Sequence, residues 1–248
     1  MSITYHNVSQ QSEEWFAIRK GRITGSKFKT ARDKLKSSQL SGKAILYARD
    51  VARERLGGTA QQVFQNAAMR MGVEQEPLAR MAYETTTGYM VQEVGFAATN
   101  CGMFGLSPDG LVDDDGVIEI KTMVGSDNLF DTVIDGDYSE YIDQCLGYLL
   151  FLDRQWVDLI LWTPDLEQSG LGMVIHRITR ADHEKAIAAL KHDLDVFADT
   201  VKELEAKLRE KAAANVKALS KFLPEEPAVA APQEDAIQEV LALELVDF

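Results

Sequence analysis

Hydrophobic and polar residues change their spacing along the chain near residue 89. Over 11–21, 41–58 and 65–88, apolar residues recur every three or four positions, which is typical of amphipathic helices. From residue 89 to residue 123, short β-branched or alternating runs are separated by glycine and aspartate, as in strands joined by hairpin turns. The chain is therefore expected to begin with helices and to continue into a sheet.

The first two helices are expected at 11–21 and 23–35. In the helix predicted at 11–21, Trp15, Phe16 and Ile18 should point inward. In the segment that follows, 23–35, a hydroxyl near the start can cap a helix by accepting a hydrogen bond from a free backbone N–H. Thr24 and Ser26 are the two candidates for this N-cap.

Pro77 lies near the middle of the helical pattern 65–88. Proline removes a backbone donor and its ring clashes with the preceding turn. We therefore expect a kink at Pro77 or a join between two helices.

The order of the later elements indicates the fold class. Three strands, a helix, two strands and a long charged helix are predicted at 89–96, 102–113, 116–123, 137–153, 156–163, 172–178 and 180–218. This order predicts an α/β fold with a mixed central β-sheet flanked by helices.

The net charge of −13 argues on its own against a nucleic-acid partner, but the charge is unevenly distributed. Residues 1–56 hold twelve Lys and Arg against five Asp and Glu, a local charge of +7. Residues 223–248 hold seven Asp and Glu and no basic residue, a local charge of −7. An acidic chain can thus present one basic face. The basic run 27–36 is either part of such a face or an ordinary solvated helix surface.

Nothing in the composition indicates a membrane or secreted protein. No apolar run approaches the roughly 18 residues of a membrane span, and the first residues lack the basic and apolar blocks of a signal peptide. Cys101 and Cys145 have no metal-ligand spacing and are expected to be free thiols in a reducing cytoplasm.

The segment "LSPDGLVDDDGVIEIKT", residues 106–122, holds five acidic residues around two short apolar runs. Asp109 is expected just after a strand end, with Glu119 and Lys121 on the next strand. Strand alternation places Glu119 and Lys121 on one face, and the two isoleucines beside them on the other.

If the two segments are neighbouring hairpin strands, Asp109 and Glu119 converge. Two converging carboxylates repel and need a cation between them, and oxygen ligands of this kind select Mg²⁺ or Mn²⁺. The alternative is a surface hairpin whose lysine only extends into solvent.

Three further motifs accompany this segment. They are "W…R-x-G-x-I-T-x-S" from residue 15, "G…E…A-R…Y-E…T-x-G" from residue 72, and "YIDQCLGYLL" from residue 141. Together with "S-P-D-G-L…E-x-K" they resemble the lambda-exonuclease-like, YqaJ-type viral recombinase family of alkaline exonucleases, within the PD-(D/E)xK nuclease superfamily. The resemblance covers roughly residues 12–180 and implies a restriction-endonuclease-like core.

The resemblance implies roles for the residues of the acidic segment. Asp109 and Glu119 would be metal ligands together with the backbone carbonyl of Ile120, and Lys121 would be catalytic. Glu76 would reach the metal site from its helix. Its alternative role is that of an exposed partner of Arg80, one helical turn away.

Three more residues receive roles from the same resemblance. Gln144 would lie beside the catalytic lysine and help to orient the nucleophile, unless it is only a helix-surface amide. The family often has a second glutamine two residues later, where this chain has Leu146. Arg19 and Ser26 would bind the 5′ phosphate end of DNA, and an N-cap role for Ser26 is compatible with this because helix N-termini bind phosphate.

The function implied is that of a Mg²⁺-dependent 5′→3′ exonuclease, in which Mn²⁺ can substitute. It would degrade one strand of linear double-stranded DNA and leave 3′ single-stranded overhangs. Family members form ring-shaped homotrimers and work with a single-strand annealing protein, which implies a phage or prophage protein in the cytoplasm of a bacterial host. The rival functions are a restriction-type or structure-specific endonuclease and a non-catalytic DNA-binding recombination protein.

The nuclease domain is expected to span 1–222. Residues 223–248 read as an acidic linker and tail, either disordered or docked on a neighbouring subunit or partner protein.

Overall fold

The computed structural model describes residues 2–59 and 67–222. The acidic tail predicted at 223–248 lies outside these residues. The chain divides into two compact units, 1–209 and 210–248. Among the described residues of the second unit, Val216, Leu219 and Phe222 expose their apolar side chains. No described helix is long and apolar enough to cross a membrane.

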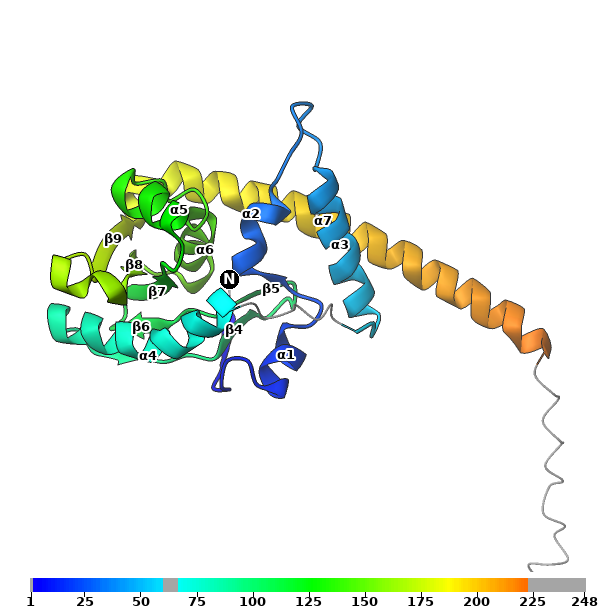
Figure 1. Cartoon of the computed structure of the whole chain (residues 1–248). Helices are drawn as coiled ribbons and strands as arrows, with labels where there is room; N and C mark the ends of the chain where they lie inside the picture. Colours follow the sequence, from blue (N-terminus) through cyan, green and yellow to red (C-terminus); the bar gives the residue numbers. More distant parts are fainter. Residues whose placement is uncertain (1, 60–66, 223–248) are drawn as a thin grey trace, which may run out of the picture. The chain divides into compact units, whose positions relative to one another are not determined.

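Figure 1 shows the helices and strands of the described residues. The longer helices are α1 (Glu13–Arg19), α3 (Gly42–Arg55), α4 (Ala67–Thr87), α6 (Ile142–Leu152) and α7 (Arg180–Leu219). Shorter helical segments are η1 (Gly25–Lys27), α2 (Phe28–Ala31), α5 (Ser126–Asn128), η2 (Leu129–Ile134), η3 (Pro164–Ser169) and η4 (Ser220–Phe222). The strands are β1 (Ile3–His6), β2 (Ile23–Thr24), β3 (Val91–Gln92), β4 (Phe96–Thr99), β5 (Phe104–Leu106), β6 (Gly110–Val112), β7 (Gly116–Thr122), β8 (Trp156–Trp162) and β9 (Met173–Thr179).

The strands form two sheets. Five strands pair in the order β3-β6-β7-β8-β9, and four pair in the order β1-β4-β5-β2. Within the first sheet β7 and β8 are parallel, whereas β6 is antiparallel to β7 and β9 to β8. The predicted α/β fold with a mixed central sheet flanked by helices is confirmed. The sequence did not indicate the second sheet, in which β4 and β5 pair with the N-terminal strands β1 and β2.

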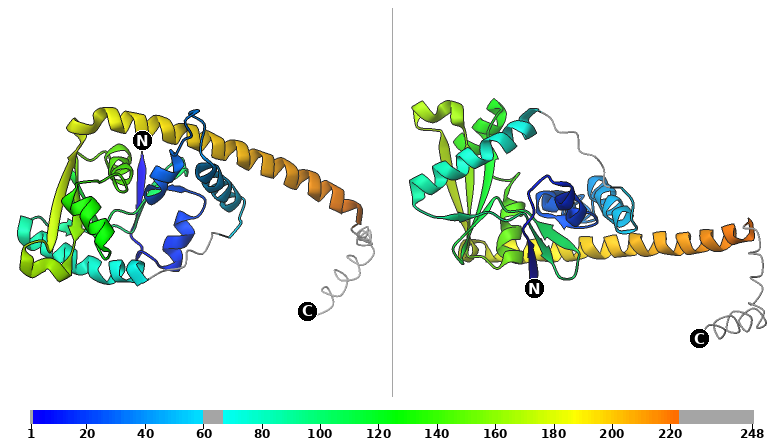
Figure 2. Two further views of the ribbon diagram at one scale, coloured as in Figure 1. Left: turned by 45° about the horizontal axis from the view of Figure 1, so that its top comes forward. Right: turned by 90° about the horizontal axis from the view of Figure 1, so that it is seen from below.

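Helices cover both faces of the five-stranded sheet (Figure 2). On one face, Tyr83 of α4 packs with Ile118 and Ile120 of β7 in one apolar cluster. On the other face, Leu149 of α6 and Leu190 of α7 belong to the larger core with Val117, Leu159 and Leu161. Because side chains alternate along β7, Glu119 and Lys121 face α6 rather than α4.

The parallel pair β7–β8 explains why α6 lies beside Glu119. Parallel neighbours need a crossover connection, and here α6 forms part of it. Arg32 beside α2 then ties the start of α6 to α7, since its guanidinium forms ion pairs with Asp143 at 2.7 Å and with Asp193 at 2.8 Å. The start of α6 is thus held in place by both packing and charge.

Several local predictions for the first helices are wrong. Phe16 is 54% exposed, because α1 is a short surface helix that buries only Trp15. The helix expected over 23–35 is reduced to η1 and α2. Of the two N-cap candidates, Thr24 occupies the cap position but its side chain makes no capping hydrogen bond, and Ser26 lies inside η1. Of the two alternatives predicted at Pro77, the join between two helices is wrong, since α4 runs through it, whereas the kink stays a prediction.

Candidate active site around Glu119

The antiparallel pairing of β6 with β7 brings Asp109 to the middle of β7. Gly110 pairs with Ile118, so Asp109 lies just ahead of β6 and opposite the centre of its neighbour. The Oδ2 atom of Asp109 accepts a hydrogen bond of 2.6 Å from the backbone N–H of Ile120. The convergence expected from the sequence is therefore present.

Glu119 is the most deeply buried carboxylate of this group, with 2% of its surface exposed. Its Oε1 atom lies 2.6 Å from Nζ of Lys121 and accepts a hydrogen bond of 2.7 Å from Nε2 of Gln144. Its Oε2 atom lies 2.5 Å from the hydroxyl of Tyr148. A buried carboxylate needs donors on both oxygens, and here three side chains supply them.

Tyr148 is a site residue that the sequence analysis missed. Its hydroxyl is fully buried and accepts a hydrogen bond of 2.8 Å from Nε2 of Gln144. The backbone carbonyl of Ser107 lies 3.1 Å from the same hydroxyl. The spacing between Gln144 and Tyr148 could have indicated this role, because Tyr148 follows Gln144 by one helical turn and shares its face of α6. Where the family often has a second glutamine, Leu146 packs in the core instead.

Glu76 enters the neighbourhood from α4. Its carboxylate pairs with Arg80 at 2.7 Å, and Arg80 also pairs with Glu93 at 2.5 Å. Burial raises the pKa of Glu76, and the charge of Glu119 adds to that effect despite the pull of Arg80. Glu76 is thus both an ion-pair partner of Arg80 and close enough to the site to sense its charge.

The carboxylates are crowded, and their pKa values show it. Burial raises the pKa of Asp109 well above its usual range, and the charges of Glu119 and then Glu76 raise it further. Burial alone would lower the pKa of Lys121, but the charges of Glu119 and Asp109 outweigh burial and raise it. The single positive charge of Lys121 therefore does not neutralise the combined negative charge of Asp109, Glu119 and Glu76.

This donor set fits a hard divalent cation. Mg²⁺ prefers oxygen ligands, and proteins usually bind it through one or two carboxylates while it keeps several waters. No group of three or more His, Cys, Asp or Glu in residues 2–59 and 67–222 is arranged to hold a metal. Asp109 and Glu119 nevertheless supply two carboxylates whose repulsion a cation would relieve, and a cavity of about 460 Å³ reaches Asp109 and Glu76.

Arg19 is linked to the same site through Ser107. Its guanidinium lies 3.9 Å from the centre of the Trp15 ring and donates a hydrogen bond of 3.3 Å to Oγ of Ser107. Nε1 of Trp15 donates to the same Oγ at 3.0 Å. Ser107 precedes Asp109 by two residues, so Arg19 is held beside the carboxylate cluster.

Ser26 is exposed within η1 and has no hydrogen bond to the residues of the cluster in the described part of the chain. The adjacent Gly25 lies against Gln144, since a Cβ built on Gly25 would be 3.7 Å from Cγ of Gln144. The structure therefore places the segment of Ser26 next to α6, but a helix as short as η1 offers no N-terminal anion site.

A second buried carboxylate, Asp158 on β8, belongs to the packing and not to this site. Both its oxygens accept hydrogen bonds of 2.7 Å from Arg177, and Tyr83 donates to it at 2.7 Å. Its charge is satisfied on the α4 face of the sheet, opposite to Glu119.

The chain matches the model of the YqaJ-like viral recombinase domain family over residues 14–154. No curated protein sequence matches the chain significantly.

Solved structures are similar to most of the chain. The alkaline exonuclease LHK-Exo from Laribacter hongkongensis is 33% identical with a TM-score of 0.71, and the match covers 82% of this chain and 99% of that chain. A structure of LHK-Exo in complex with dAMP is 34% identical with a TM-score of 0.72 and the same coverage. A phage-related exonuclease from Haemophilus somnus 129PT shares the fold at 16% identity and a TM-score of 0.58, over 77% of this chain and 96% of that chain.

Asp109→Asn should stabilise the metal-free protein. A carboxyl whose pKa is raised by folding destabilises the folded state above its unfolded pKa, and this penalty fades as the pH falls through the folded pKa. Removing the charge should raise the free energy of unfolding at pH 7 by on the order of 1 kcal/mol, measured by urea denaturation with EDTA. Mg²⁺ should stabilise the wild type and not the variant. A variant that is less stable than the wild type would show that the carboxylates do not repel.

Tyr148→Phe should destabilise the protein by about 1–3 kcal/mol, because a buried carboxylate and a buried amide each lose a hydrogen-bond partner. Tyr138→Phe is the matched control, since Tyr138 stacks on His176 through its ring. Urea denaturation of both variants measures the difference. Equal losses would mean that the Tyr148 hydroxyl contributes nothing specific.

Proposed function

Since the chain belongs to the YqaJ-like viral recombinase domain family, we propose that it is a Mg²⁺-dependent 5′→3′ exonuclease. It acts on linear double-stranded DNA, degrades one strand and leaves 3′ single-stranded overhangs. The observation that carries the proposal is the fixed Glu119 carboxylate, held by Lys121, Gln144 and Tyr148 beside Asp109. The similarity to LHK-Exo, an alkaline exonuclease also solved in complex with the deoxynucleotide dAMP, supports it.

Asp109, Glu119 and the carbonyl of Ile120 are the groups that would hold the metal ion. When bound, such an ion supplies charge stabilisation at a phosphate and lowers the pKa of a water molecule. Mn²⁺ offers the same preference for oxygen ligands and is expected to substitute.

Lys121 acts as a cation in this proposal. Its pKa is raised mainly because the charges of Glu119 and Asp109 outweigh burial, so it keeps its proton at neutral pH. An ammonium group can neutralise charge on the phosphate or give a proton to the departing oxygen, but it cannot accept one. The centre of the Tyr141 ring also lies 5.6 Å from Nζ of Lys121.

Gln144 and Tyr148 are proposed to orient Glu119 and the attacking water, and to take no part in bond formation. The amide nitrogen of Gln144 bridges Glu119 and Tyr148, which fixes the plane of the amide. Its amide oxygen can then accept a hydrogen from the attacking water in one orientation. Glu76 contributes negative charge from α4 and can hold a water molecule of the metal.

Arg19 and Ser26 are proposed to receive the 5′ phosphate of the DNA end. A guanidinium suits this role because its fork makes two charge-assisted hydrogen bonds to one phosphate. Arg19 is linked to the segment that carries Asp109 by its hydrogen bond to Ser107, and Ser26 adds a neutral donor from the exposed surface of η1.

The oligomeric state, the partner protein and the host are inferred from the family alone. We propose a homotrimeric ring around the DNA and a single-strand annealing protein as partner. A phage or prophage protein in the cytoplasm of a bacterial host is the setting in which such an enzyme would prepare DNA for annealing.

Linear duplex DNA should be digested from its 5′ ends in Mg²⁺, and EDTA should abolish the digestion because the two carboxylates then lack their ion. Release of acid-soluble nucleotides measures the rate. A closed circular duplex of the same sequence is the control and should stay intact. Cleavage of the circle would favour an endonuclease, and binding of both DNAs without Mg²⁺-dependent cleavage would favour a non-catalytic DNA-binding protein.

Arg19→Ala should slow digestion of 5′-phosphorylated ends by about tenfold or more, because a charge-assisted contact to the end is lost. Digestion of 5′-hydroxyl ends should change little, so the preference between the two ends should shrink toward unity. Arg49→Ala, which removes an exposed arginine of α3, is the matched control. An equal loss on both kinds of end would reject the end-phosphate role.

A further inference from the structure

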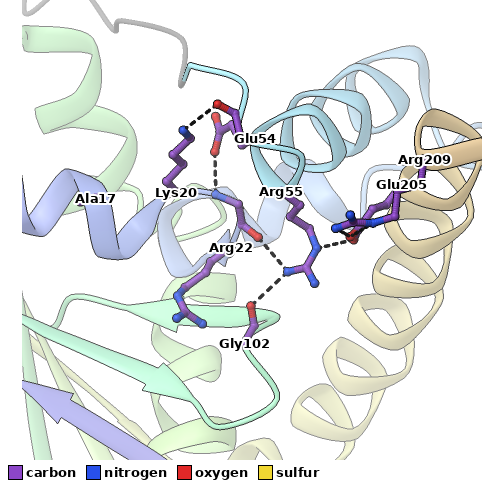
Figure 3. Close-up of a pocket in the computed structure, with 10 residues that line it drawn as sticks. Ala17, Lys20, Arg22, Glu54, Arg55, Gly102, Glu205 and Arg209 are labelled. Carbon is purple, nitrogen blue, oxygen red and sulfur yellow. Dashed lines mark hydrogen bonds and ion pairs between the residues drawn. The ribbon is translucent and has the colours of Figure 1, made fainter. Parts of the chain in front are cut away.

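Arg55, the last residue of α3, contacts three segments that lie far apart in the sequence (Figure 3). Its Nη1 atom donates hydrogen bonds of 3.2 Å to the backbone carbonyls of Gly21 and Gly102. Its Nε atom donates a hydrogen bond of 2.5 Å to Glu205 of α7. A single guanidinium therefore joins the turn after α1, the turn between β4 and β5, and α7.

The end of α3 holds the turn after α1 through both backbone polar groups of Gly21. The N–H of Gly21 donates a hydrogen bond of 2.8 Å to Glu54, and its carbonyl accepts the one from Arg55. The φ of Gly21 is +71°, in the left-handed region, and a Cβ there would be 2.9 Å from Cγ of Arg55. The missing side chain thus lets Arg55 pack directly against the turn.

The position of α1 depends on contacts of this kind. The helix has seven residues, and a helix of fewer than about 12 residues is barely stable in water on its own. Trp15 anchors its middle, because Nε1 donates hydrogen bonds to the carbonyl of Gly95 at 3.1 Å and to Oγ of Ser107 at 3.0 Å. Gly21 anchors the turn that follows the helix. Arg19, the last residue of α1, lies between these two anchors.

Arg55 also reaches the segment that carries the acceptor of Arg19. The Arg19 guanidinium donates to Oγ of Ser107, which directly follows β5. Gly102 lies in the turn that leads into the same strand. By contacting Gly21 and Gly102, Arg55 therefore holds together the two segments that meet in the hydrogen bond between Arg19 and Ser107.

We propose that Arg55 is a positioning residue for recognition of the DNA end, because it fixes the turn after α1 and so places the Arg19 guanidinium at the 5′ phosphate. Arg55 acts through Arg19 and does not itself touch DNA, since its donors are engaged by the protein. A displacement of about 1 Å can cost on the order of 10²-fold in rate, so a small shift of Arg19 is sufficient to matter. The inference rests on the proposed function and adds a residue that determines its preference for phosphorylated ends.

The test is a double-mutant cycle of Arg19→Ala and Arg55→Ala in the full chain. Fluorescence anisotropy in EDTA measures the affinity for a short linear duplex that carries either 5′-phosphate or 5′-hydroxyl ends, without cleavage. Arg55→Ala should lower the ratio of these two affinities by roughly threefold or more, the scale of coupling within one hydrogen-bond network. In the Arg19→Ala background, Arg55→Ala should leave the ratio unchanged, because the group that it positions is gone.

Arg209→Ala is the matched control. Arg209 pairs with the same carboxylate, that of Glu205 at 2.6 Å, but makes no hydrogen bond to Gly21 or Gly102 in the part of the chain that the structure describes. Its affinity ratio should equal that of the wild type. If the melting temperature shows that Arg55→Ala is unfolded, Arg55→Lys should give a smaller loss of the same sign, since an ammonium can keep the ion pair but lacks the fork that also reaches both carbonyls.

Three results would overturn the proposal. They are an unchanged ratio in Arg55→Ala, an equal loss of affinity for both duplexes, and an effect of Arg55→Ala on the ratio that persists in full without Arg19. A wild type that binds both duplexes equally would overturn it together with the end-phosphate role of Arg19. A wild type that prefers the phosphorylated duplex but does not cut DNA in Mg²⁺ would instead defeat the exonuclease function, and the cycle would still decide the role of Arg55.

Discussion

A carboxylate removed from water requires donors for both of its oxygens, and Glu119 imposes this requirement on the whole site. Lys121 comes from the same strand, while Gln144 and Tyr148 come from α6. These donors can reach Glu119 only because β7 and β8 are parallel and the connection between them places α6 on that face of the sheet. The chemistry of the site therefore depends on the topology of the sheet.

Tyr148 also connects the buried Glu119 carboxylate to the N-terminal part of the chain through Ser107. The carbonyl of Ser107 lies near the Tyr148 hydroxyl, and the side chain of Ser107 accepts hydrogen bonds from Trp15 and Arg19. The loop that carries Asp109 thus connects the buried carboxylate to the basic N-terminal segment. This explains how an acidic chain brings a guanidinium beside a carboxylate cluster. Near neutral pH the crowding of carboxylates opposes folding of the metal-free protein, a cost that a bound cation would offset.

Strand alternation and motif spacing were sufficient to predict that Asp109 meets the centre of β7 and that Glu119 and Lys121 share a face. These features depend on a local period and on a short hairpin, which sequence encodes directly. Tyr148 was missed because an apolar helix such as α6 gives no sign of which tyrosine hydroxyl meets a buried charge. The pairing of β4 with β1 and the exposure of Phe16 depend on contacts between segments distant in sequence, which no local pattern specifies. The role of Ser26 stays a prediction, as do those of the other site residues.

If the carboxylates of Asp109 and Glu119 form one cation site beside Lys121, a divalent metal ion must bind between them. The most direct measurement is the anomalous difference density of a crystal soaked in Mn²⁺. We expect one strong peak within coordination distance of both carboxylates, about 2 Å from an oxygen of each. A peak bound elsewhere, or no peak near these carboxylates at saturating Mn²⁺, would contradict it.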